Sequence, residues 1–202
     1  MILASRASLI LVLVAVAFSP AAIAHGEANW MHGMLDGAVL FFTSLQSLLP
    51  VLMVAFLARR HGLRSVAIEA AAPGIGLLIA LLSLPVPGDP ATIGLYARGY
   101  LIALGLLVLL NLRLFGGLVL ILGLITGAMI GLEAKAVVVG DSATGLAPAV
   151  GFVSSAIGSY LPAALIAGRY TGGRQRIAVR VVASWIAAIA AIDIAFMMVG
   201  SG

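Results

Sequence analysis

Four side chains near the start of the chain have the chemistry to bind a transition metal ion. His25, Glu27, His32 and Asp36 lie within twelve residues of one another. His32 and Asp36 are four positions apart, so on a helix they project from the same face. Imidazole and carboxylate groups suit Ni²⁺, Co²⁺, Cu²⁺ or Zn²⁺. We predict metal contact at His25, His32 and Asp36, with ordinary interfacial polar residues as the alternative.

Three further ionisable residues stand inside long apolar stretches: Asp193, Glu69 and Arg98. A charge in such surroundings is costly, which makes each residue a candidate for function. Asp193 is either functional or a silent protonated carboxyl. Arg98 either extends outward or pairs with Asp193. Glu69 either complements a helix N-terminus or pairs with Arg64. His61, beside two arginines, is expected to be a solvated loop residue.

The composition places the chain in a membrane. Hydrophobic residues make up 63% of the sequence and charged residues 9%, whereas soluble domains have about 25% charged residues. The net charge of +4 is explained by positive residues at membrane edges, next to anionic headgroups, rather than by nucleic acid. The chain has no cysteine, which excludes disulfides, thiolate metal sites and cysteine nucleophiles.

The first residues resemble a secretory signal. Arg6 supplies the positive start, residues 9–18 an apolar core, and Ala22-Ile23-Ala24 a small-residue cleavage site. We therefore predict a signal peptide over 1–24 and a single transmembrane domain over 25–202. The alternative is an uncleaved first helix.

Six apolar segments follow, each close to the span of about 20 residues that a bilayer requires. Backbone groups cannot stay unpaired in hydrocarbon, so the segments are predicted to be helices and the fold class all-α, a polytopic membrane helix bundle. The predicted spans are 33–57, 66–84, 94–112, 114–132, 149–168 and 178–199.

Basic residues alternate between the connections. Eight of the ten that follow the leader fall in the first, third and fifth loops, namely Arg59, Arg60, Arg64, Arg113, Arg169, Arg174, Arg176 and Arg180. Because lysine and arginine are retained on the cytoplasmic side, these loops are predicted to be cytoplasmic. Both mature termini then face the periplasm, across the bacterial inner membrane.

Small residues recur at helical spacing in two spans. Gly123, Gly127 and Gly131 are four apart, and a second set comprises Gly151, Ser155 and Gly158. Each set is predicted to let a neighbouring helix approach closely. The alternative is a conduit lined by backbone.

Motifs of known enzyme classes are missing from the sequence. It contains no GxSxG, no P-loop and no HExxH. An intramembrane protease with paired aspartates is not expected either, because Asp193 stands alone in its span. We predict that the chain is not an enzyme.

The order of these features resembles the HupE/UreJ family: a leader ending in Ala-His-Gly, a basic short loop, six helices, and a glycine-patterned fourth span ending in glutamate. The family's first-helix signature, G-F-x-H-P-x-x-G-x-D-H-L-L, falls on 37–49. The matching residues are Gly37, Leu48 and Leu49. Leu40, Gln46 and Ser47 occupy the histidine, aspartate and second histidine positions.

The family's fourth-helix signature, H-G-x-x-H-G-x-E, falls on 126–133. The matching residues are Gly127, Gly131 and Glu133. Thr126 and Ile130 stand where histidines are expected. Helix-shaping residues are therefore retained, whereas most residues that would coordinate a divalent cation are replaced.

The resemblance implies a nickel or cobalt permease associated with hydrogenase or urease maturation, with Ni or Co as cargo. Passage would run from His25, His32 and Asp36 past Gln46, Ser47, Thr126 and Glu133, with Asp193 as a charge partner. The alternative is a non-transporting accessory protein or subunit that packs against a membrane complex or assists metalloenzyme maturation. The expected partners are the lipid bilayer and a membrane protein or a second copy, not nucleic acid.

Overall fold

The computed structural model describes residues 28–58, 61–83, 90–138, 146–169 and 173–200. Within these ranges the chain is helical and contains no strand, so the all-α prediction is confirmed. The predicted signal peptide and His25 lie outside the described residues. The helices are α2 (Ala28–Thr43), α3 (Leu45–Ala58), α4 (Leu63–Glu69), α5 (Ala71–Leu82), α6 (Pro90–Leu109), α7 (Gly116–Val138), α8 (Ala147–Arg169) and α9 (Gly173–Gly200).

Five of the described segments are long and apolar enough to cross a bilayer, and the structure is that of a membrane helix bundle. They are Arg64–Leu82, Thr92–Leu109, Gly116–Lys135, Ala147–Gly168 and Ile177–Met197. Each overlaps one of the predicted spans. The first of them joins α4 to α5 through Ala70, whose backbone is itself helical (φ −64°, ψ −25°).

The predicted span 33–57 is not one straight helix. α2 and α3 meet at Ser44 and are bent by 73°, and together they count as a sixth candidate span. The Thr43 hydroxyl donates back to the Val39 carbonyl at 2.8 Å, a bond that bends helices because it competes with the backbone ladder. The predicted span 33–57 is therefore helical on both sides of a break at Ser44.

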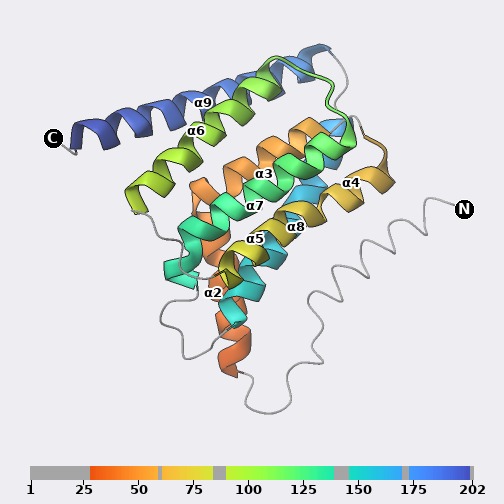
Figure 1. Cartoon of the computed structure of the whole chain (residues 1–202). Coiled ribbons are helices and arrows are strands. Elements are labelled where there is room, and N and C mark those ends of the chain that lie inside the picture. The colour runs from red at the N-terminus through yellow and green to blue at the C-terminus, as the bar shows by residue number, and fades with distance from the viewer. Residues whose placement is uncertain (1–27, 59–60, 84–89, 139–145, 170–172, 201–202) are drawn as a thin grey trace, which may run out of the picture.

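Helix α3 lies at the centre of the bundle and packs against α6, α7 and α8 (Figure 1). Its Val51, Met53 and Val54 are fully buried. Phe41 of α2 meets Phe152 of α8 edge to face, with ring centroids 5.3 Å apart. α9 packs mainly on α6, at the edge of the molecule in Figure 1. α9 is thus joined to the rest of the bundle chiefly through α6.

Glycines permit the closest helix contacts, as predicted for α7. A Cβ on Gly127 would lie 1.9 Å from the carbonyl oxygen of Pro73 on α5, and one on Gly131 would lie 2.7 Å from the Cβ of Ala80. On α8, Gly151 is equally close to Met34 of α2. The close helix contact predicted for Gly151, Ser155 and Gly158 is wrong at Gly158, because a Cβ there would have no neighbour within 4 Å.

Candidate functional site

Arg98 connects three helices. From α6, its guanidinium Nε donates to a carboxylate oxygen of Asp193 on α9, and its Nη1 lies 3.6 Å from Oε1 of Glu133 on α7. The Arg98 side chain is largely buried, whereas that of Asp193 is 43% exposed. Of the alternatives for Arg98, pairing with Asp193 is confirmed.

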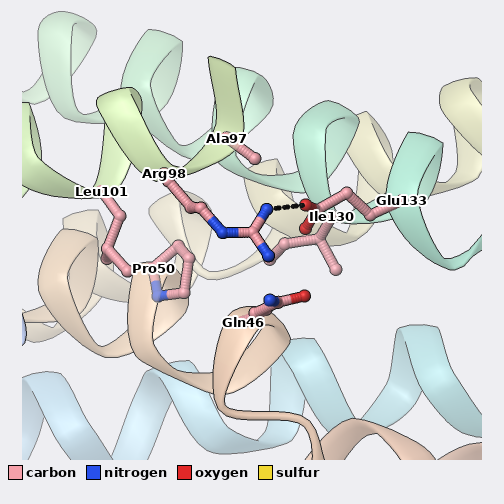
Figure 2. A pocket seen from close by; sticks show the side chains of 7 residues that line it. All are labelled: Gln46, Pro50, Ala97, Arg98, Leu101, Ile130 and Glu133. Carbon is pink, nitrogen blue, oxygen red and sulfur yellow. Dashed lines mark ion pairs between the residues drawn. The ribbon is translucent and has the colours of Figure 1, made fainter. Parts of the chain in front are cut away.

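A small cavity lies beside this guanidinium (Figure 2). Its volume is about 20 Å³, enough for about one water molecule. Figure 2 shows Gln46 of α3 and Glu133 of α7 on either side of the Arg98 head group. The lining residues are Gln46, Pro50, Ala97, Arg98, Leu101, Ile130 and Glu133.

Three of these lining residues are positions that the HupE/UreJ resemblance aligns with the two signatures. Gln46 stands at the aspartate position, Ile130 at the second histidine position of the fourth helix, and Glu133 at the retained glutamate. These positions come from different helices, yet they converge on one cavity. The positively charged group beside them is Arg98.

The charge of Arg98 bears directly on cation binding. At an effective dielectric constant of about 20, a divalent ion about 4 Å from a guanidinium would be repelled by about 8 kcal/mol. Glu133 is already engaged by Arg98. Arg98 therefore weakens the attraction of Glu133 for a divalent cation in the cavity.

The other signature residues stabilise helix contacts. Thr126 is fully buried and its hydroxyl lies 3.1 Å from that of Tyr100. The Tyr100 hydroxyl also donates to the Leu122 carbonyl at 2.7 Å. Ser47 is buried and donates to the Ser44 hydroxyl at the α2–α3 break, 3.1 Å away. Neither Thr126 nor Ser47 lines the cavity.

The predicted metal-capture residues are only partly placed. His32 and Asp36 are both exposed on α2. The described part of the chain contains no group of three or more histidine, cysteine, aspartate or glutamate side chains arranged to hold a metal ion. Metal contact at His25, His32 and Asp36 therefore stays a prediction.

A second polar cluster surrounds Glu69. This side chain is almost fully buried and lies 2.7 Å from Nδ1 of His61, and it accepts a hydrogen bond from Ser65 at 2.8 Å. Arg64 is exposed and is not among these partners. Of the two alternatives for Glu69, pairing with Arg64 is therefore replaced by pairing with His61, and the expectation that His61 is a solvated loop residue is wrong.

The sequence signal for this cluster was weak. His61 and Glu69 are eight positions apart, and the chain between them leaves a connection and enters α4, so no helical spacing links them. The only indication in the sequence was the position of the ionisable Glu69 in the first turn of an apolar span.

The chain matches no known family model, no curated protein and no solved structure. The fold and the two polar clusters are therefore the basis for any function proposed for this membrane protein.

Proposed function

We propose that this chain is a multi-pass protein of the bacterial inner membrane that keeps a HupE/UreJ-like scaffold and acts as a non-transporting accessory protein or subunit. The observation that carries this proposal is the Arg98 guanidinium beside Glu133, in the cavity that Gln46 and Ile130 also line. A built-in cation takes the place that a transported cation would need.

The proposed orientation follows from the basic connections. At one end of the bundle, three helices finish (α3, α6 and α8) and three helices start (α4, α7 and α9) (Figure 1). The arginine-rich loops join these helix ends, so this end is the cytoplasmic one. The Arg98 cavity then lies in the outer half, since Arg98 is about 12 Å along α6 from Pro90.

Nickel or cobalt permeation is the second candidate, and the α2–α3 break favours it. Transporters commonly bind cargo where a membrane helix is interrupted, and Gln46 lies two residues after Ser44. In this case Arg98 would have to release Glu133, from which it is 3.6 Å away. Capture would involve His25, His32 and Asp36, and passage Gln46, Thr126 and Glu133.

Uptake of radiolabelled Ni²⁺ or Co²⁺ separates the two candidates. We expect cells that express the wild-type chain to accumulate no more metal than cells with an empty vector. Uptake above the empty vector that falls in a His32→Ala/Asp36→Ala variant would instead support the permease.

The accessory role has its own test. Extraction from the membrane in a gentle detergent, followed by native mass spectrometry, should give a complex heavier than the chain itself. A chain that always runs alone, at its own mass, would contradict the role of a stable subunit.

A further inference from the structure

The Glu69 cluster lies at the opposite end of the bundle from the Arg98 cavity and has no part in the proposed function. His61 precedes α4, Ser65 and Glu69 belong to α4, and Leu114 lies just before α7. His61 Nε2 is 2.9 Å from the Leu114 carbonyl oxygen. One imidazole ring thus links α4 to the connection between α6 and α7.

The hydrogen-bonding partners fix where the protons are. A carbonyl oxygen can only accept, so His61 Nε2 carries a hydrogen and donates it to Leu114. The 2.7 Å contact between His61 Nδ1 and Glu69 Oε1 then needs one proton between the two atoms. Without that proton, a nitrogen lone pair would face a carboxylate oxygen. Because Oε1 also accepts from Ser65, two donors converge on it and favour the carboxylate form of Glu69.

Two buried polar atoms nearby have no hydrogen-bond partner among the described residues: Oε2 of Glu69 and the hydroxyl of Tyr160 on α8. Tyr160 is fully buried on α8, which packs against α4, the helix that carries Glu69. A carboxylate oxygen accepts and a phenol can donate or accept. A single water molecule between them would satisfy both, and buried waters typically fill this role.

The surroundings of the His61–Glu69 pair contain few other charges among the described residues. Gly116, at the start of α7, leaves room beside the carboxylate, because a Cβ there would lie 3.2 Å from Oε1. Among the described residues, Tyr160 is the titratable group that faces the pair from α8. Arg64 and Arg113, the described cations nearest to it in sequence, are both exposed. His61 is 16% exposed and Glu69 only 1%, so a proton from water would reach the histidine first.

We propose that His61 and Glu69 form a buried proton-binding site, an imidazolium–carboxylate pair completed by one water molecule that bridges Glu69 Oε2 and the Tyr160 hydroxyl. The attraction between His61 and Glu69 then exists only in the protonated state. Loss of the Nδ1 proton would turn the attraction between His61 and Glu69 into repulsion. The site's ligands are a proton and a water molecule.

Nitrogen-15 NMR of the full chain, labelled at histidine and held in lipid nanodiscs, tests whether His61 carries the Nδ1 proton. Comparison with a His61→Gln variant assigns the His61 signals among the three histidines of the chain. We expect both ring nitrogens of His61 to be protonated in the wild type. In Glu69→Gln, whose amide can donate to Nδ1, we expect a neutral ring protonated at Nε2 alone. A neutral His61 ring in the wild type would overturn the proposal, and so would one equivalent of bound Zn²⁺ that is lost in His61→Gln.

Thermal unfolding of a Tyr160→Phe variant tests the water. If a water bridges the two groups, removing the hydroxyl leaves that water and Glu69 with one bond fewer, and the unfolding temperature falls. An unchanged or higher unfolding temperature would show that the hydroxyl was simply unsatisfied and would overturn the bridging water. Because only the phenol oxygen is removed, this variant keeps the packing of α8 and remains informative even if Glu69→Gln does not fold.

Discussion

Arg98 on α6 is bonded to Asp193 on α9, a residue 95 positions further along the chain. The bond joins the peripheral helix α9 to α6, and the same guanidinium approaches Glu133 on α7. A single positive charge therefore serves two carboxylates from two other helices. This arrangement explains how ionisable residues are tolerated in apolar spans, since each is compensated by an opposite charge.

Replacement of this cation should destabilise the bundle. Arg98→Gln leaves two carboxylates without their positive partner, and we expect the free energy of unfolding in mild detergent to fall by about 2 kcal/mol. This is less than the 3–5 kcal/mol (roughly) typical of fully buried pairs, because Asp193 is 43% exposed.

Two variants make that measurement specific. An Arg98→Gln/Asp193→Asn double variant should recover part of the loss, because the coupled charges are removed together. Arg180→Gln, on the exposed surface of α9, should change the free energy by no more than about 0.5 kcal/mol. Equal losses in Arg98→Gln and Arg180→Gln would contradict a specific role for the pair.

The positions of the helices could be predicted from the sequence because span length and apolar composition are local properties. The bend at Ser44 could not be, because the chain is apolar on both sides of it and its geometry depends on how α2 packs on α8. The Arg98–Asp193 bond could be named only as one alternative, since no spacing rule connects residues so far apart. His61 was predicted wrongly because its basic neighbours suggested solvent, whereas the fold brings it to the buried Glu69.

The glycine contacts give a prediction with a matched control. Gly127→Ala would place a Cβ 1.9 Å from a backbone oxygen of α5, which forces α5 and α7 apart at a cost of about 3 kcal/mol. Gly158→Ala meets nothing within 4 Å and should stabilise α8 by up to about 1 kcal/mol, because alanine favours helix.

Unfolding of both glycine variants in the same detergent checks this prediction. Indistinguishable stabilities would show that α5 and α7 do not approach each other as closely as the structure has them.

The proposed orientation can be tested because the chain has no cysteine of its own. We expect a membrane-impermeant maleimide to label Thr92→Cys, at the start of α6, in intact spheroplasts. Arg113→Cys, at the other end of the bundle, should react only after permeabilisation. Both native residues are exposed, so access is decided by the side of the membrane. The reverse labelling pattern would place the basic connections outside.

The most direct test of Arg98 as a built-in cation is to restore the signature residues around it and titrate with Co²⁺. A Gln46→Asp/Ile130→His variant supplies a carboxylate and an imidazole beside Glu133, a donor set that suits Co²⁺. We predict that one equivalent of Co²⁺ binds, with the absorption bands of a nitrogen- and oxygen-coordinated ion, when Arg98→Ala is added. With Arg98 retained, the affinity should be at least about tenfold lower, because the guanidinium repels the ion. Equal Co²⁺ affinity with and without Arg98 would contradict the account.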